Sequence, residues 1–327
     1  LVNMTVSGTR VFGLLTFDNI NARLPASLAI DTNSTGSTSR SLTLYKGITL
    51  QNTTTSVIFM GANGTLSVVL ADDNTFTTSA GSTLEFGSAV AISGVFRITK
   101  EGLGTVTLDA ANSFTGGVTI NAGILKITKG TALGPLPASY IADQVILNGG
   151  TLEYASDSNF SSGGNRGFSI GSNGGTIRVS GAGDYSISAI VADLSGQSGA
   201  LTKTGQGTLT LDEASTYSGG TTISAGILQL GNGSATGSIA GNVLDNATLA
   251  FNRSNTYQFD GVISGSGGVQ QNGGGTTVLT AANTYAGGTT INAGVLQLGN
   301  GGATGAISGN VLNNATLASN RSNLYQF

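Results

Sequence analysis

The chain has 327 residues, a net charge of −3 and only 9% charged side chains, whereas 52 residues are glycine. It has no basic cluster, which argues against a nucleic-acid-binding protein, and no run of about 18 apolar residues that could form a membrane-spanning helix. Cysteine, histidine and tryptophan are absent. Their absence removes several of the usual site residues, and the lack of cysteine fits export through an oxidising compartment.

The N-terminal part of the chain, residues 1–90, carries the least regular pattern. Apolar–x–apolar triplets, which place two side chains on one face of a strand, occur at residues 42–44, 66–68 and 84–86, and the next triplet begins at residue 106. The intervals from one triplet to the next are each close to the length of one coil, that is, one turn of a solenoid. We therefore interpret residues 1–90 as divergent N-terminal coils of the solenoid that residues 91–327 form, with a separate N-terminal domain as the alternative. We expect a corner at Leu24 and Pro25 and a loop or protruding turn at residues 32–41.

Residues 92–128 hold the first complete motif, and a less regular stretch follows it. Proline cannot donate to a strand ladder, so the Gly-Pro-Leu-Pro segment at 134–137 predicts an excursion from the stack. The triplet pattern resumes at residues 145–154 and again at 177–179. Between them, the glycine-rich residues 159–173 are predicted to form a flexible loop or a set of wide turns.

The C-terminal part of the chain contains one long unit twice. Tyr217 and Tyr285 are equivalent in the two copies, and 34 of the 43 positions from 217 to 259 match their counterparts in 285–327. Within the unit, apolar triplets begin at residues 209, 228, 249, 277 and 296. The triplet at 277 is the counterpart of the one at 209, so three steps between triplets make up one copy. We therefore interpret the long unit as three coils of about 23 residues each.

Short strands that recur every ~20–25 residues between glycine and asparagine turns are too closely spaced for βαβ units. They predict an all-β fold, a right-handed parallel β-helix in which each coil hydrogen-bonds to the coils about 4.8 Å above and below it. The apolar triplets then form columns inside the helix, whereas Thr210, Gln229 and Gln297 lie on its wet face. A β-sandwich with coincidental repetition is the alternative, but a sandwich does not need a long copy at this identity.

Three segments share one motif and lie near residues 100–128, 203–231 and 271–299. The second copy reads K-T-G-Q-G-T-L-T-L from Lys203, Y-S-G-G-T-T-I from Tyr217 and G-I-L-Q-L-G from Gly226. It resembles the autotransporter-associated β-strand repeat of bacterial autotransporter passengers and related large surface proteins. The first copy has Phe114 in place of the tyrosine, and the third has Gln271 in place of the lysine. The resemblance implies a β-helix on the cell surface but no particular activity.

We assign no catalytic, cofactor-binding or metal-binding residue, and we predict neither a cofactor nor enzymatic activity. Asp72 and Asp73, the adjacent pair of aspartates, are interpreted as solvating a turn rather than binding Ca²⁺. Asp212 and Glu213 follow a strand, but threonine and alanine replace them in the next copy, so the repeat does not require acids there.

Two further sets of side chains are interpreted as structural. Arg253 and Arg321 recur in the same N-R-S-N context, which predicts corner residues that bond backbone carbonyl groups. The glycine runs lack the Lys-Ser/Thr and the helix of a phosphate-binding loop. Phe114, Tyr217 and Tyr285 have rings that could stack on sugars, but we expect them to plug corners over the core. Three whole coils would put the two tyrosines about 14 Å apart along the axis, beyond ring contact.

These observations predict a structural, surface-exposed stalk, adhesin passenger or filament segment, located outside the cell or on the bacterial surface. Such a segment spans distance and presents surface. The expected partners are host surfaces or polysaccharides, and further copies of the chain stacked end to end, but not nucleic acid. We also expect a longer parent protein, because the second long unit stops inside a repeat. The alternative is a polysaccharide-degrading β-helix or a phage tailspike-like protein, which needs acids from separate coils ~5–10 Å apart in one groove.

Overall fold

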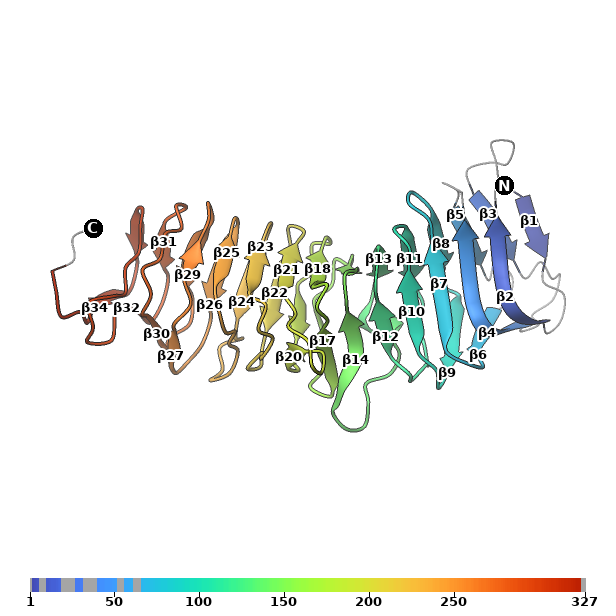
Figure 1. The fold of residues 1–327 in the computed structure, drawn as a ribbon, viewed down its shortest axis with the longest axis horizontal. Coiled ribbons are helices and arrows are strands. Elements are labelled where there is room, and N and C mark those ends of the chain that lie inside the picture. Colours follow the sequence, from blue (N-terminus) through green and yellow to red (C-terminus); the bar gives the residue numbers. More distant parts are fainter. Residues whose placement is uncertain are drawn as a thin grey trace. The chain divides into compact units, whose positions relative to one another are not determined.

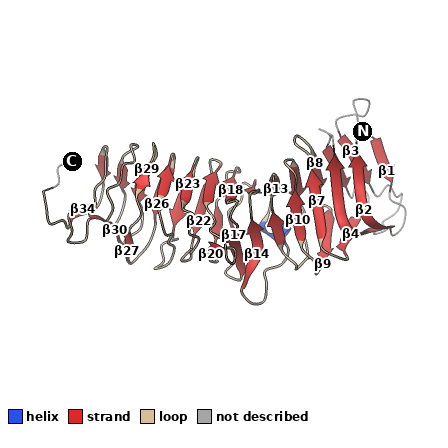
Figure 2. Cartoon of the chain, in the orientation of Figure 1, coloured by secondary structure: helices blue, strands red, loops and turns tan. Residues whose placement is uncertain are grey.

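The computed structural model describes residues 2–5, 10–18, 27–31, 40–51, 56–60 and 66–324. It is all-β, a parallel β-solenoid of about 12 turns ~23 residues apart, as the sequence predicts. Its strands are shown in Figures 1 and 2. The contacts divide the chain into two units, Leu1–Ser156 and Asp157–Phe327. The corner expected at Leu24 and Pro25 and most of the loop expected at residues 32–41 lie outside the described residues.

The strands of the first unit are β1 (Val2–Thr5), β2 (Arg10–Asp18), β3 (Ser27–Asp31), β4 (Arg40–Gln51), β5 (Ser56–Met60), β6 (Leu66–Leu70), β7 (Asn74–Thr78), β8 (Thr83–Phe86), β9 (Val90–Gly94), β10 (Ile98–Glu101), β11 (Thr105–Leu108), β12 (Val118–Ile120), β13 (Ile124–Ile127), β14 (Ile141–Leu147) and β15 (Thr151–Tyr154). A short 3-10 helix, η1 (Gly130–Leu133), lies between β13 and β14. One face consists of β1, β3, β5, β8, β11, β13 and β15 in that order.

The long strand β4 turns a corner of the first unit. Its first half pairs with β6 and its second half, from Gly47, pairs with β7. Gly47 has φ 104° at the bend, and a Cβ there would lie 2.0 Å from the carbonyl oxygen of Thr75. The triplets at 66–68 and 84–86, which the sequence spacing placed on successive coils, therefore belong to different faces, in β6 and β8. The regular spacing was misleading because one turn can carry a triplet on more than one face.

The strands of the second unit are β16 (Phe160–Ser161), β17 (Arg166–Ile170), β18 (Gly175–Val179), β19 (Tyr185–Ile187), β20 (Val191–Asp193), β21 (Leu201–Thr204), β22 (Thr208–Leu211), β23 (Thr221–Ile223), β24 (Ile227–Leu230), β25 (Val243–Asp245), β26 (Thr248–Phe251), β27 (Thr256–Phe259), β28 (Ile263–Ser264), β29 (Gly268–Gln271), β30 (Thr276–Leu279), β31 (Thr289–Ile291), β32 (Val295–Leu298), β33 (Val311–Asn313) and β34 (Thr316–Ser319). Its largest complete sheet has the order β16-β19-β22-β24-β26-β29-β31-β33, and a second has the order β27-β30-β32-β34.

A dry column of apolar side chains runs through the second unit. Leu209 of β22 lies opposite Leu228 of β24, which lies opposite Leu249 of β26 in a parallel register. All three leucines have 0% exposure. Burying one such side chain contributes about 1.5–3 kcal/mol, so the column stabilises every turn through which it passes. This arrangement confirms the central expectation from the sequence.

The shared motif forms two consecutive turns in which two strands are followed by a loop and then by two more strands. In the second copy, β21 pairs with β23 and β22 pairs with β24. The loop between them buries Tyr217 completely, and its hydroxyl group lies 2.7 Å from Thr221 Oγ1. Gly220 has φ 82° and Gly226 has φ 69°, and the glycines at the same positions of the other two copies are also left-handed. Only glycine adopts these angles without strain, which explains their recurrence.

A buried cation caps the tight turn inside the motif. Lys203 has 0% exposure, and its Nζ donates to the carbonyl oxygens of Thr204, Gly205 and Ala225 at 2.8–3.0 Å. Lys100 does the same in the first copy, and burial lowers the pKa of both ammonium groups to about 8. In the third copy Gln271 replaces the lysine and donates to Gly273 and Gly275. The position therefore selects a donor to carbonyl groups rather than a charge.

The long unit is three turns plus one strand, not three whole turns as the sequence spacing suggested. Three turns lead from Leu201 of β21 through β23 and β25 to Ile263 of β28, each strand lying opposite the one before it. The strand of the next copy equivalent to β21 is β29, and β29 pairs with β26 and β31 in the neighbouring sheet. Successive copies of the motif in the second unit are therefore displaced by one face of the solenoid.

The triplet at residues 277–279 was the source of this error. Its spacing suggested that Leu249 stacks on Thr277, but Leu249 lies opposite Val269. Thr277 lies opposite Tyr257 of β27, on another face. A triplet pattern reports which side of a strand faces the core, and it does not report which face of a three-sided coil the strand occupies.

Two expectations about irregular segments have opposite outcomes. The excursion at residues 134–137 is confirmed, because a loop follows η1 there and Leu136 is 50% exposed. The glycine-rich segment 159–173 is not simply a loop, because it contains β16 and β17. Phe160 N donates to Asp184 O and Ser162 N donates to Ser186 O, at 2.9 and 2.8 Å. Neighbouring turns thus supply the hydrogen bonds that hold this weakly patterned sequence extended.

Candidate functional site

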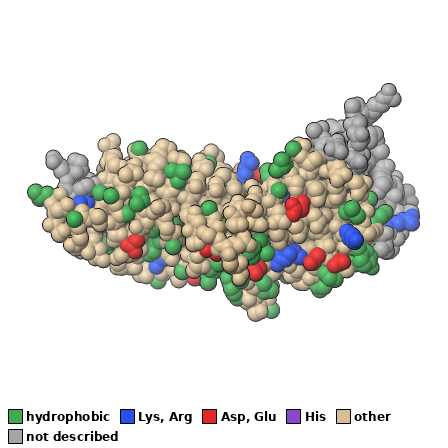
Figure 3. Space-filling view, viewed as in Figure 1, with side chains coloured by type: hydrophobic (Ala, Val, Ile, Leu, Met, Phe, Trp, Pro, Cys, Tyr) green, Lys and Arg blue, Asp and Glu red, His purple; other side chains and the backbone are tan. Residues whose placement is uncertain are grey.

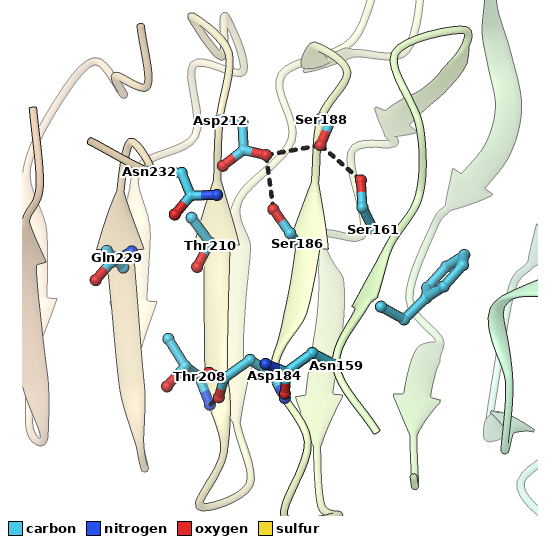
Figure 4. Close-up of a pocket in the computed structure, with 11 residues that line it drawn as sticks. Asn159, Ser161, Asp184, Ser186, Ser188, Thr208, Thr210, Asp212, Gln229 and Asn232 are labelled. Atoms are coloured by element: carbon cyan, nitrogen blue, oxygen red, sulfur yellow. Dashed lines mark hydrogen bonds between the residues drawn. The ribbon is translucent and has the colours of Figure 1, made fainter. Parts of the chain in front are cut away.

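A polar groove of about 400 Å³ crosses the outer side of β16, β19, β22 and β24 in the second unit. We call it the β16–β24 groove (Figure 4). It is lined by Asn159, Phe160, Ser161, Asp184, Ser186, Ser188, Thr208, Thr210, Asp212, Gln229 and Asn232. Ten of these eleven side chains can form hydrogen bonds, and none is a lysine or an arginine. The lining is therefore polar without a positive charge.

Strand register places the lining side chains in rows. Ser161 lies opposite Ser186, Ser186 opposite Thr210, and Thr210 opposite Gln229, so four turns supply one row across the floor. Alternate residues of a strand point to the same side, and the residues between these, such as Leu209, point into the core. The row exists because outward positions of successive turns coincide, although its members lie far apart in the sequence.

A carboxylate anchors the upper end of the groove. Asp212 follows β22, and its Oδ2 accepts hydrogen bonds from Ser186 Oγ at 2.7 Å and from Ser188 Oγ at 2.6 Å. The hydroxyl oxygens of Ser188 and Ser161 lie 2.7 Å apart and extend this network to β16. The other carboxylate oxygen, Asp212 Oδ1, is buried and has no hydrogen-bond partner among the described residues. The two serine hydroxyls are thus fixed in orientation, with lone pairs left for a ligand.

At the lower end of the groove, backbone N–H groups donate hydrogen bonds to side-chain oxygens. Asp184 N donates to Asn159 Oδ1 at 2.9 Å, and Thr208 N donates to Asp184 Oδ1 at 3.3 Å. The ring of Phe160 stacks on the buried ring of Tyr185, with centroids 5.9 Å apart and planes 10° apart. Figure 4 shows Asp184, Asn159 and Thr208 together at one end and Asp212 at the other.

The two carboxylates of the groove do not form the close pair that glycoside hydrolysis needs. Asp184 lies opposite Thr208 in the strand register, four residues before Asp212, which corresponds to ~13 Å along the strand. Separations of about 5–5.5 or 6.5–9.5 Å are typical of glycosidases. Among the described residues there is also no group of three or more acidic side chains that could hold a metal ion. The geometry is that of a hydrogen-bonding surface.

The acids and arginines singled out in the sequence have structural positions. Asp73 N donates to Asp72 Oδ1, and Arg97 N donates to Asp73 Oδ1, both at 2.8 Å, so the pair bonds backbone N–H groups at residues 73 and 97. Arg253 donates to the carbonyl oxygens of Gly237 and Ala235. Arg321 makes the equivalent bonds to Gly305 and Ala303, each at 2.6 Å. The interpretation of both arginines as corner residues is confirmed.

The three aromatic residues of the motif are not ligand-binding rings. Phe114, Tyr217 and Tyr285 all have 0% exposure, which confirms that they plug the core. The expectation that the two tyrosines lie three coils apart along one edge is wrong. Tyr217 lies between β22 and β23, whereas Tyr285 lies between β30 and β31, so the one-face displacement puts them on different sides of the core.

Sequence reasoning missed the groove. Asp212 was set aside because its counterpart in the next copy is a threonine, Thr280. Ser186 and Ser188 lie outside the motif, and Asn159 to Ser161 fall in the segment expected to be a loop. The first copy also has an aspartate at this position, Asp109, so Asp212 did not stand out from the repeat and no signal in the sequence marked the groove.

The face of the protein seen in Figure 3 carries few charges. In Figure 3, neutral polar side chains and backbone cover most of the visible face, and acidic and basic side chains are scattered. None of the described residues forms a helix long and apolar enough to cross a membrane. A surface of this kind interacts through hydrogen bonds more than through long-range electrostatic steering.

Comparison with known proteins agrees with this architecture. Residues 98–127, 201–230 and 269–298 match the passenger-associated-transport-repeat, at the three places where the sequence shows its motif. A stretch of 211 residues is 35% identical to the "Adhesin BmaC autotransporter" of Brucella suis biovar 1 (strain 1330). That stretch is 64% of this chain but 6% of the relative, so the chain spans a small part of its length. No solved structure matches the chain. The chain therefore contains three passenger-associated-transport-repeats within a parallel β-solenoid, and over part of its length it is similar to an autotransporter adhesin.

Proposed function

We propose that this segment is a non-enzymatic surface stalk that holds binding surfaces away from the cell and takes part in adhesion. The observation that carries the proposal is the continuous parallel ladder: within the second unit, β22, β24, β26, β29, β31 and β33 pair in register without interruption. Such a ladder satisfies the backbone polar groups turn by turn. It is suited to bearing load and presenting surface, and it needs no catalytic centre.

The relative supports the adhesive part of the proposal, because its name describes an autotransporter adhesin. The uncharged, hydroxyl-rich outer faces also fit this role, since they can form many hydrogen bonds with a wet surface. In the second unit these faces carry rows of threonine, such as Thr176 and Thr202 on adjacent strands. The stalk and the contact surface are then the same structure.

Adhesion can be tested with beads that carry the purified chain. We expect beads coated with the folded chain to be retained on host-cell layers or on polysaccharide-coated surfaces more strongly than beads coated with the heat-unfolded chain or with albumin. Equal retention of all three would refute adhesion. Antibodies to the chain should also stain intact cells of the bacterium that makes it, and staining that requires permeabilised cells would refute the surface location.

End-to-end stacking of chains is a separate part of the proposal. Parallel strands at the ends of a solenoid offer unpaired N–H and C=O groups to another strand. Light scattering over a concentration series tests it, because stacking predicts a mass that rises with concentration. A constant monomer mass across that series would reject stacking and leave the stalk unaffected.

A further inference from the structure

We propose that the β16–β24 groove is a binding site for a neutral saccharide of one or two sugar rings. This inference deepens the proposed function, on which it rests for its biological setting, but its evidence is the chemistry of the groove. A volume of about 400 Å³ lies at the small end of the ~300–1,000 Å³ range of ligand sites. Such a space suits a mono- or disaccharide rather than a protein segment.

The charges of the lining favour a neutral ligand. Asp184 and Asp212 are the charged side chains in the lining, and no lysine or arginine accompanies them. An anionic ligand, such as a uronic acid, a sulfate or a phosphate, would meet negative charge without a cation to pair with. A ligand without charge avoids this cost and can still use every hydrogen-bonding group.

The hydrogen bonds already present show what the ligand must supply. Ser186 and Ser188 donate their hydroxyl protons to Asp212 Oδ2. Their oxygens can therefore only accept hydrogen bonds from a ligand in the groove. Asp212 Oδ1 is buried, so the carboxylate acts through the two serines that it orients and not through a free oxygen. Gln229 donates one of its two amide N–H groups to Gly231 O, at 3.0 Å, which leaves the other N–H and the carbonyl oxygen. The groove therefore needs a ligand with several closely spaced donors that can also accept, which is the character of a polyhydroxylated ring.

The apolar member of the lining, Phe160, does not turn its ring toward the row of hydroxyl groups. Phe160 lies opposite Tyr185, and Tyr185 lies opposite Leu209. Because Tyr185 and Leu209 are buried in the core, the ring of Phe160, which is stacked on that of Tyr185, lies on the core side of β16. Recognition of a ligand in the groove therefore depends on the hydrogen-bonding groups of the floor.

The strand ladder keeps these groups in place before a ligand arrives. Ser161, Ser186 and Thr210 stand on successive strands about 4.8 Å apart. Because backbone pairing fixes their spacing, binding does not have to order a loop. A calcium ion fits the site less well, because Asp184 lies ~13 Å along the strand from Asp212, whose Oδ2 is already shared by two serines.

Titration of the purified full chain tests the proposal. The probes are glucose, galactose, mannose, N-acetylglucosamine and their disaccharides. Sodium sulfate and calcium chloride are titrated separately, to test whether the groove binds an anion or a cation instead. We expect at least one neutral sugar to bind, and we expect Asp212→Thr, which installs the residue of the next copy, to weaken that binding at least tenfold. Thr210→Ala should also weaken it, because Thr210 lies on the floor of the groove.

A matched control removes the same hydroxyl group elsewhere. Thr222→Ala changes a threonine on β23, in another sheet and outside the groove, and should leave sugar binding unchanged. Unchanged melting temperatures would show that all three variants fold. Binding that Thr210→Ala and Thr222→Ala weaken equally would overturn the proposal. So would binding of none of the sugars, or a response to sulfate or calcium in their place.

The outcome is separable from that of the proposed function. If no sugar binds while coated beads still adhere, the groove assignment fails and adhesion must use another face. If sugar binds but beads are not retained on any surface, the adhesive role fails while the site stands.

Discussion

The two copies of the motif in the second unit, residues 201–230 and 269–298, have the same internal structure on different faces of the solenoid. Both bury a tyrosine whose hydroxyl group meets a threonine four residues later, at 2.7 Å in one copy and 2.6 Å in the other. Within the motif they differ at two informative positions, where Lys203 corresponds to Gln271 and Asp212 to Thr280. In the remainder of the long repeated unit, Asp245 corresponds to Asn313.

The comparison separates what the scaffold requires from what it tolerates. The buried tyrosine and the left-handed glycines occur in both copies because the backbone path depends on them. The capping position tolerates a lysine or a glutamine because either donates to carbonyl groups. At the position of Asp212 the third copy has Thr280, so the scaffold does not require an acid there, and Asp212 contributes to the β16–β24 groove. Positions that differ between the copies are therefore positions at which the scaffold tolerates change.

The largest expected effect is the loss of a motif tyrosine. Tyr217→Ala and Tyr285→Ala should each lower the free energy of unfolding by about 3–5 kcal/mol, the range for truncating a fully buried aromatic side chain. Tyr217→Phe should cost only about 1 kcal/mol, for one lost hydrogen bond. Denaturant unfolding, combined with hydrogen exchange to locate the affected turns, measures both. A small loss in only one copy would show that the copies are not structurally equivalent.

A smaller effect is expected at the capping lysine. Lys203→Met leaves three carbonyl oxygens without their donor and should lower the free energy of unfolding by about 1–3 kcal/mol. Lys203→Gln imitates the third copy, where Gln271 makes equivalent bonds, and should cost clearly less. Chemical denaturation of the two variants gives the comparison. Equal losses would mean that the charge, and not the donor, is what the turn requires.

The smallest effect, and the only stabilising one, is expected at Asp245. Its side chain has 0% exposure, its Oδ2 has no partner among the described residues, and burial raises its pKa to about 6. A carboxyl group whose pKa is higher when folded stabilises the protein below the unfolded pKa, about 4, and this contribution is lost as the pH rises through 6. Asp245→Asn, which imitates Asn313, should therefore gain on the order of 1 kcal/mol at pH 7.

The pH profile makes this prediction specific. The advantage of Asp245→Asn over the unmodified chain should grow between pH 4 and 6 and level off above, as followed by thermal unfolding at each pH. An advantage that is the same at pH 4 and pH 7 would mean that Asp245 does not carry the raised pKa.

The sequence was sufficient for the fold and insufficient for the groove. Leu209, Leu228 and Leu249 identify the core column, because alternation along a strand is a local property. Which strand lies above which depends on the number of corners in each turn, so the triplet at residue 277 was assigned to the wrong face. The groove depends on the contact between Ser186 and Asp212, which lie 26 residues apart in the sequence. No local sequence pattern in either segment predicts this contact.

Engineered disulfides test most directly whether the motif moves by one face per copy, and the natural chain has no cysteine to interfere. The structure places Thr256 opposite Thr276, at a strand spacing of about 4.8 Å that a disulfide can bridge. Whole-turn stacking of the triplets at 249 and 277 would instead place Thr248 opposite Thr276. Under mild oxidation, peptide mass spectrometry should find the bond in the variant with cysteines at 256 and 276, and not in the one with cysteines at 248 and 276. The opposite result would contradict the displacement of the repeat and the face assignments that follow from it.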